Sequence, residues 1–402
     1  MTGAPTVEDM ELATGKVFQD HQLEALADAQ EQVDKGVWLR LCLYHRTGAG
    51  KTLTSLACVR LTGAGEVLVL APPITHDAWV AAGRELGLQV SPISHAKFRQ
   101  KTYKVRRDQA MIVDEFHLLG GHKGIGWKKL DRIARGLQAP LVIASATPNY
   151  NDAERVYCIQ HVLDPDSARG GYLQFLYDRC VTRVNPFGQE PIVEGFRYYA
   201  DAEDYLKHLP HVHYVEDEAI KQVSITDVEL QVDTPPELRE LGLDRRRRRV
   251  IASQMEARHA LKRHRILDED GLVRSEVFDE IAYLAGQVAT PTLVFCASSE
   301  VAEALARTVE KHGERPLLIT GKTSTAVKQH FVRQFITGEY PVLIGTASLA
   351  TGTDGIDKMC DHLLIVDDTD DDALRRQLIG RILPRGLDTD LSGKVISRLV
   401  YL

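Results

Sequence analysis

The segment from His45 to Thr52 constrains the fold of this chain more than any other. It places two glycines just ahead of a Lys-Thr pair, between an apolar run at residues 39–44 and a helix-like run at residues 53–61. A strand, a glycine-rich loop, a Lys-Thr pair and a helix in this order predict a phosphate-binding loop. Backbone N–H groups of such a loop surround phosphate oxygens, and the positive end of the helix points at them. The segment therefore predicts a nucleotide site, with ATP and Mg²⁺ as the expected cofactors.

The side chains of this loop have separate predicted roles. Lys51 is expected to reach the β- and γ-phosphates, and Thr52 is expected to ligate Mg²⁺. His45 stands where this motif usually has glycine or alanine, and the sequence offers no physical reason for it. The remaining residues are expected to hold the phosphates through their backbone: Thr47, Gly48, Ala49 and Gly50.

Two carboxylates follow an apolar run at residues 110–113 and supply the partner that this loop needs. Asp114 suits the coordination of Mg²⁺, and Glu115 suits the acceptance of a proton from the attacking water. An acidic pair at a strand end can also be a solvated sheet edge. The phosphate-binding loop upstream favours the catalytic interpretation.

Length and composition indicate a globular protein of two domains. The chain has 402 residues, ordinary apolar content and a net charge of −7, and none of its apolar runs is long enough for a membrane helix. Nucleic-acid binding would therefore have to come from local basic patches. The six cysteines lack metal-ligand spacing and predict buried, reduced thiols in a cytoplasmic protein: Cys42, Cys58, Cys158, Cys180, Cys296 and Cys360.

Alternating strands and helices predict an α/β fold with two doubly wound parallel sheets. The first domain is expected at residues 1–165 and the second at residues 286–402. Between them, residues 166–285 lose the alternation and predict a helical or irregular connector. Ligands bind such sheets at the carboxyl ends of the strands, where the polar motifs fall.

These motifs resemble those of superfamily 2 helicases and translocases over nearly the whole chain. Residues 113–117 resemble the family's Asp-Glu-x-His box, and residues 145–147 resemble its Ser-Ala-Thr motif. Residues 18–22 resemble its adenine-recognition segment. In the second half, residues 346–357 resemble the fifth motif, and residues 377–386 resemble the sixth.

The resemblance implies two tandem RecA-like domains and assigns further roles. It implies that three residues bind the nucleotide: Gln22, Gly352 and Asp354. It implies that four others couple hydrolysis to movement: His117, Ser145, Thr147 and Gln377.

The sixth motif supplies an arginine that stabilises charge on the transferred phosphoryl group. The family places its two arginines three residues apart, whereas Arg381 and Arg385 are four apart with Pro384 between them. Either arginine therefore remains a candidate for the catalytic role.

Nucleic-acid contacts are expected to be made mainly to phosphates. The basic stretch from Lys97 to Arg107 and the run Arg245–Arg249 are candidates, and a solvated surface is an equal alternative for each. The resemblance and the charge pattern together select six residues: Pro73, Ser94, His95, Lys97, Thr346 and Ser348.

Within the superfamily the nearest resemblance is to the Snf2-like group. Residues 70–73 with Trp79, and residues 147–149, resemble that group's motifs, but its Arg-Arg-x-Lys signature is absent from the connector. The compact core is typical of phage-type members, which would act in the host cytoplasm.

The sequence thus predicts an ATP-dependent DNA helicase or translocase that unwinds or remodels forked or branched DNA. Two alternatives stay open: an RNA-dependent ATPase, and an ATP-gated clamp that binds DNA or protein without translocating. No membrane partner is expected, and the oligomeric state is open, with a monomer as the simplest case.

Overall fold

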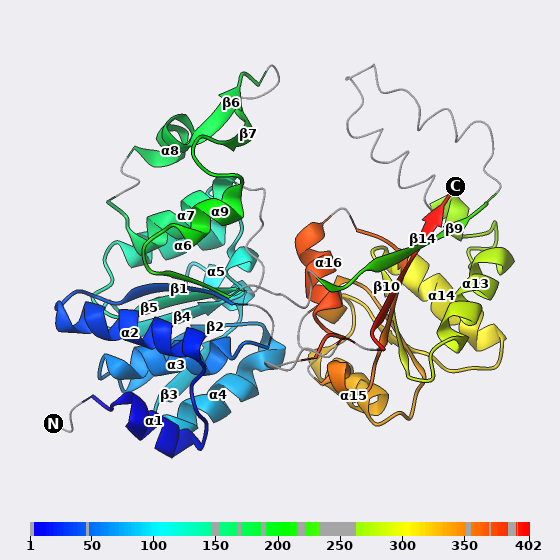
Figure 1. The fold of residues 1–402 in the computed structure, drawn as a ribbon, viewed down its shortest axis with the longest axis horizontal. Helices are drawn as coiled ribbons and strands as arrows, with labels where there is room; N and C mark the ends of the chain where they lie inside the picture. The colour runs from blue at the N-terminus through cyan, green and yellow to red at the C-terminus, as the bar shows by residue number, and fades with distance from the viewer. Residues whose placement is uncertain are drawn as a thin grey trace. The chain divides into compact units, whose positions relative to one another are not determined.

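The computed structural model describes residues 4–45, 48–145, 153–166, 170–185, 190–215, 222–232, 263–350, 355–369, 371–384, 391 and 393–402. The chain divides into two compact units, Met1–Asp217 and Glu218–Leu402. Each unit has its own parallel sheet and its own core (Figure 1).

The first unit is built on a six-stranded parallel sheet of order β3-β2-β4-β5-β1-β8. Its strands are β1 Arg40–His45, β2 Glu66–Leu70, β3 Gln89–Ile93, β4 Ala110–Asp114, β5 Leu141–Ser145 and β8 Val212–Val215. Its helices are α1 Val7–Thr14, α2 Asp20–Asp34, α3 Lys51–Leu61, α4 His76–Glu85, α5 His95–Arg99, α6 Ile125–Ala134, α7 Ala153–Leu163, α8 Gly171–Arg179 and α9 Ala202–Lys207.

Strand β1 shows how the alternation of side chains builds the core of this unit. Leu41 and Leu43 are completely buried on one face with residues of α2 and α3. Cys42 lies on the opposite face, in a cluster with residues of α6 and α7. Both faces of the sheet are therefore covered, and its strands read as continuous apolar runs.

The second unit has a six-stranded parallel sheet of order β11-β12-β10-β13-β14-β9. Its strands are β9 Ile225–Leu230, β10 Thr292–Cys296, β11 Leu317–Ile319, β12 Val342–Gly345, β13 His362–Asp367 and β14 Val395–Tyr401. Its helices are α13 Ser275–Gly286, α14 Ser299–Lys311, α15 Thr325–Ile336 and α16 Asp372–Ile379.

The predicted fold class is confirmed, but the interpretation of residues 166–285 as helical or irregular missed four short strands, which lie there beside α8, α9 and most of α13. Strand β8 pairs with β1 in the first sheet, and β9 pairs with β14 in the second. Strands β6 Cys180–Arg183 and β7 Ile192–Phe196 form an antiparallel pair. Edge strands such as β8 are short, so their pairing with distant strands leaves little local signal.

Two simpler expectations can be compared directly with the structure. All six cysteines lie in described positions, and they are buried and free of disulfide bonds. No helix in the described ranges is both long and apolar enough to cross a membrane.

Candidate nucleotide-binding site

The predicted phosphate-binding loop joins the end of β1 to the start of α3. Gly48 and Gly50 both adopt positive φ angles, 82° and 76°, which favour glycine. A Cβ atom at Gly50 would also lie only 2.5 Å from Gln22 Nε2. Lys51 begins α3, and its Nζ donates to the His45 carbonyl oxygen at 3.0 Å. Thr47 lies outside the described residues, so its predicted role has no structural account.

The start of α2 is fixed against this loop by two side chains. His21 Nε2 lies 3.0 Å from the carbonyl oxygen of Ala49, within hydrogen-bonding distance. Gln22 is buried, accepts the Gln19 N–H at 2.9 Å and donates to Thr54 Oγ1 at 2.9 Å. The structure therefore brings Gln22 to the loop, as the predicted adenine-recognition segment requires, while its contact with adenine stays a prediction.

His45 now has a physical explanation as a packing residue. Its side chain follows Leu41 and Leu43 on the same face of β1 and is completely buried. The ring contacts the His21 ring edge-on, with centroids 5.1 Å apart. Burial lowers the pKa of His45 to about 3, and the nearby His21 and Lys51 act in the same direction. The ring is therefore neutral at pH 7, and it packs against His21, which also contacts the Ala49 carbonyl of the loop.

Asp114 ends β4 and Glu115 follows it directly. Only β5 separates β4 from β1, the strand that leads into the phosphate-binding loop. Burial and the adjacent Glu115 carboxylate raise the pKa of Asp114, whereas Lys51 lowers it. Asp114 Oδ1 accepts the Glu115 N–H at 3.0 Å. Glu115 has a positive φ of 49°, an uncommon conformation for a residue with a side chain, which turns its carboxylate away from the strand direction.

Three polar side chains surround the acidic pair. His117 Nδ1 lies 3.4 Å from Glu115 Oε2 and 3.4 Å from Ser145 Oγ. The structure thus brings together two of the predicted coupling residues, His117 and Ser145. Thr147 lies outside the described residues. On the other side, His95 Nε2 contacts the Asp114 carbonyl oxygen at 2.9 Å.

Asp114 and Thr52 fit a Mg²⁺ ion in chemical terms. Mg²⁺ in phosphate-binding sites typically takes one or two protein oxygens, with phosphate and water oxygens completing the shell. A buried carboxylate with a raised pKa is a group whose ionised form a divalent cation stabilises. Thr52 is the second residue of α3, directly after Lys51, so its hydroxyl belongs to the same end of the sheet.

In the second unit the predicted motif residues gather beyond the end of β12. Thr346 follows that strand and is buried, and Ser348 lies in the short helix Ala347–Ala350. Arg381 is also buried, and its Nε donates to the Ala350 carbonyl oxygen at 3.0 Å. Gln377 lies in α16 and is buried. Three predicted residues lie outside the described ranges: Gly352, Asp354 and Arg385.

Lys328 belongs to this group but was missed by the sequence predictions. Its Nζ donates to the Ser348 carbonyl oxygen, and the residue is only 7% exposed. Burial and the nearby Arg381 lower its pKa to about 8. It shares the buried face of α15 with Val332 and Phe335. The sequence could have revealed it, because Lys328 stands at a position where the amphipathic pattern of the helix calls for an apolar residue.

The predicted nucleic-acid contacts differ in accessibility. Pro73 and Lys97 are exposed, and Ser94 caps α5 by accepting the Lys97 N–H at 3.1 Å. His95 is buried, and burial lowers its pKa to about 4, so its ring is neutral at pH 7. A neutral, buried imidazole is a poor partner for phosphate, and the geometry makes His95 a support for Asp114. The other contacts stay predictions.

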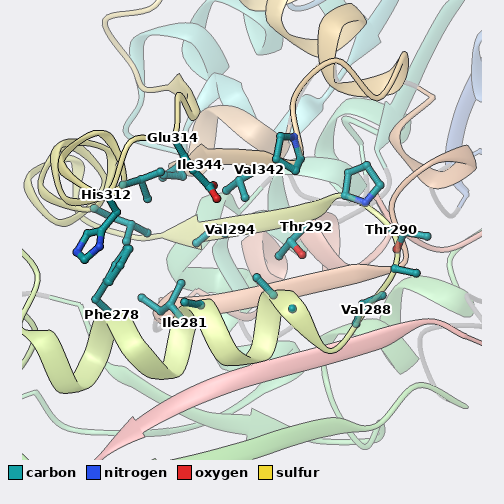
Figure 2. Close-up of a pocket in the computed structure, with 18 of the residues that line it drawn as sticks. Phe278, Ile281, Val288, Thr290, Thr292, Val294, His312, Glu314, Val342 and Ile344 are labelled. Atoms are coloured by element: carbon teal, nitrogen blue, oxygen red, sulfur yellow. The ribbon is translucent and has the colours of Figure 1, made fainter.

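A cavity of about 710 Å³ lies at the opposite end of the second sheet from these motif residues. Figure 2 shows its mostly apolar wall, formed by Phe278 and Ile281 of α13 together with Val294 and Ile344 of the strands. Thr292 and Val342, which begin β10 and β12, also line it. This cavity lies in the second unit. The predicted nucleotide site is a different one, because the phosphate-binding loop and the acidic pair belong to the first unit.

Comparisons with known proteins agree with this arrangement. Residues 276–385 match the helicase conserved C-terminal domain. Two solved structures of Dbp5 from S. cerevisiae, the unmodified protein and a point variant, share the fold with a TM-score of 0.54 and 16% sequence identity. Each alignment covers 100% of this chain and 88% of the Dbp5 chain, and both were solved with RNA and ADP BeF3. No curated protein sequence matches the chain.

Residues 276–385 are therefore similar to a helicase C-terminal domain, and the chain shares its α/β fold with the two Dbp5 structures. The family match supports the predicted class of enzyme, a nucleic-acid-dependent ATPase. It leaves the nucleic acid itself, DNA or RNA, to be determined by experiment.

Proposed function

We propose that the protein is an ATP-dependent DNA translocase or helicase of the Snf2-like kind, acting in the cytoplasm on duplex, forked or branched DNA. The observation that supports this most is the meeting of Lys51, Asp114 and Glu115 around one end of the first sheet. Burial, a cation and a second carboxylate all act on the pKa of Asp114 there. This is the arrangement that phosphoryl transfer to water requires.

The side chains of the first unit then have distinct tasks in hydrolysis. Lys51 and the glycine backbone hold the phosphates, and Asp114 with Thr52 holds Mg²⁺, which when bound neutralises charge on the phosphate oxygens. Glu115 accepts the proton of the attacking water. His117 touches both Glu115 and Ser145, so it can transmit a change at the base to the end of β5.

The second unit supplies positive charge for the same reaction in this proposal. Arg381 or Arg385 stabilises the negative charge that spreads over the transferred phosphoryl group. Gly352 and Asp354 bind the nucleotide from this unit, and Gln377 couples hydrolysis to movement. Cycles of hydrolysis then move the protein along the nucleic acid.

The test is the ATPase rate of the full chain with single-stranded, duplex, forked and four-way DNA, and with RNA as the control. Stimulation by DNA above RNA is the expected result. Stimulation by RNA alone would replace DNA by RNA as the substrate. The RNA alternative has its own support, because both Dbp5 structures contain RNA.

Translocation needs a separate measurement from ATPase activity. A third strand bound to the duplex reports movement, because a translocating protein displaces it. Displacement is expected to require ATP and an intact Glu115. DNA-stimulated ATPase without displacement would indicate the alternative function, an ATP-gated clamp.

A further inference from the structure

The antiparallel pair β6–β7 follows α8 and lies apart from the main sheet of the first unit (Figure 1). Cys180 pairs with Phe196, and Val181 pairs with Gly195. The pairing continues one residue beyond β6, because the Arg197 N–H donates to the Arg179 carbonyl oxygen at 2.9 Å. Arg179 and Arg197 are therefore directly opposite each other.

This pair of strands has an inner and an outer face. Cys180 is completely buried, and Val193 and Phe196 pack against the same apolar cluster. Side chains alternate along a strand, and opposite residues share a face. The outer face therefore carries Val181, Arg183 and Arg197, and Arg179, the last residue of α8, lies opposite Arg197; all four are exposed. We call these four residues the arginine face.

The carboxylates near the arginine face already have partners. Glu194 Oε1 lies 2.8 Å from Arg183 Nε, and Asp178 Oδ1 accepts a hydrogen bond from Gln174. Arg179 and Arg197 form no ion pair within the described part of the chain. Two neighbouring arginines that form no ion pair with a described carboxylate make a positively charged surface, which suits an anionic ligand.

Aromatic rings flank the same end of the hairpin. Tyr177 is 64% exposed on the last turn of α8, and Tyr198, next to Arg197, is 76% exposed. Arginines that contact a phosphate backbone, together with exposed rings on which bases stack, are the combination that single-stranded nucleic acid favours. An apolar protein partner would need a larger continuous apolar surface than Val181 provides.

The far end of the hairpin is tied to the loop that follows the acidic pair. Glu190, just before β7, lies 2.7 Å from Lys123 Nζ and 3.4 Å from His122 Nε2. That loop follows Glu115 by a few residues and leads into α6. A strand held on the arginine face would therefore be linked, through the ion pair of Glu190 with Lys123 and its contact with His122, to the loop that follows the acidic pair.

We propose that the arginine face binds the phosphodiester backbone of a nucleic-acid strand outside the predicted helicase motifs. The proposal rests on the proposed function, because it adds a contact for the same nucleic-acid substrate. From Arg179 to Arg183 the face extends about 13 Å along the strand, which is long enough to reach several phosphates.

The test compares the full chain with the variant Arg179→Ala/Arg197→Ala by fluorescence anisotropy of labelled single-stranded DNA and RNA. The salt concentration is varied from about 50 to about 200 mM. The variant is expected to bind about 10-fold more weakly at low salt, and the slope of log K against log salt should shrink by about 1 to 2. Its affinity for ATP should be unchanged, because neither arginine belongs to the nucleotide site.

Two controls separate contact from folding. Arg84→Ala removes an exposed arginine from α4 and should leave affinity and slope unchanged. Arg179→Lys/Arg197→Lys keeps both charges and should retain most of the slope. A loss of binding in the alanine variant that the lysine variant shares, with lowered thermal stability in both, would attribute the effect to folding and overturn the proposal.

The outcomes distinguish this proposal from the proposed function. If the unmodified chain binds nucleic acid and the alanine variant binds it equally well with the same slope, only the arginine face is refuted. That result would favour a protein partner for the arginine face instead of nucleic acid. If the unmodified chain binds neither DNA nor RNA, the proposed function and the arginine face fail together.

Discussion

His45 in the first unit and Lys328 in the second are both buried basic side chains next to predicted motifs, and they differ in charge at neutral pH. His45 lies under the phosphate-binding loop, and Lys328 lies behind the fifth motif. Burial lowers the pKa of both, to about 3 for His45 and to about 8 for Lys328. At pH 7 His45 is therefore neutral, whereas Lys328 still carries its charge.

This difference in charge indicates that His45 and Lys328 are buried for different reasons. The neutral imidazole of His45 carries no charge to desolvate, although both of its ring nitrogens are buried without a hydrogen-bond partner among the described residues. A buried ammonium whose pKa is lowered from 10.5 to about 8 costs about 3 kcal/mol of stability at pH 7. A cost of that size, beside the equally buried Arg381, is expected where a unit must attract an anion such as a phosphate.

Lys51→Ala is expected to have the largest effect, a loss of ATPase activity of more than about 1000-fold, because Lys51 is the loop residue predicted to contact the β- and γ-phosphates. The measurement is steady-state ATP hydrolysis with saturating nucleic acid. Lys128→Ala, an exposed lysine on α6, is the matched control and should behave as the unmodified chain. A normal rate for Lys51→Ala would show that the nucleotide binds elsewhere.

Glu115→Gln should separate binding from chemistry. The amide retains the size of the side chain but cannot take a proton, so hydrolysis should slow by about 100-fold or more while ATP stays bound. Equilibrium binding of a fluorescent ATP analogue and single-turnover hydrolysis measure the two steps. If turnover is unchanged, another group serves as the base.

The arginines of the sixth motif test the contribution of the second unit. Arg381→Ala and Arg385→Ala are expected to lower the ATPase rate unequally, the catalytic arginine by about 1000-fold. Because Arg381 also bonds the Ala350 carbonyl, its loss should increase hydrogen exchange in the Ala347–Ala350 helix. Unmodified rates in both variants would remove the second unit from the chemistry.

His45→Ala should change the acid sensitivity of the first unit. In the folded chain the pKa of His45 is depressed, so stability present above about pH 6.5 is lost as the pH falls towards 3. Between pH 7 and pH 5 this loss should reach about 2 kcal/mol. Hydrogen exchange of β1 and α3 measures it locally, and the variant should lose this pH dependence.

The control for this prediction is His208→Ala, which removes an exposed histidine of the same unit. It should retain the acid sensitivity of β1 and α3. Equal pH profiles for His45→Ala and the unmodified chain would contradict the explanation of His45 as a neutral packing residue.

The sequence was a good guide where local signals are strong. Continuous apolar runs identified most strands of both sheets, and the glycine loop with its acidic pair predicted a nucleotide site that remains a prediction. The partner of a buried side chain is not local, so neither the ring of His21 against His45 nor the bond from Lys328 to Ser348 could be predicted. Strand β8 was missed because it pairs with β1, which lies far upstream in the chain.

Lys328→Met should have the smallest effect, on a pH dependence that has the same sign as that of His45 but lies at alkaline pH. The folded pKa of Lys328 is depressed, so stability is recovered as the pH rises from about 8 to 10.5 and is lost below. Methionine removes the buried charge but also the bond to Ser348, so near pH 7 the two effects should offset to within about 1 to 2 kcal/mol. Hydrogen exchange of α15 and β12 should rise towards neutral pH in the unmodified chain and show no such trend in the variant.

If the variant keeps that alkaline stabilisation, Lys328 is not the charged group responsible. If it loses the trend yet hydrolyses ATP normally, the buried charge serves folding and not the attraction of phosphate, and the contrast with His45 loses its functional meaning.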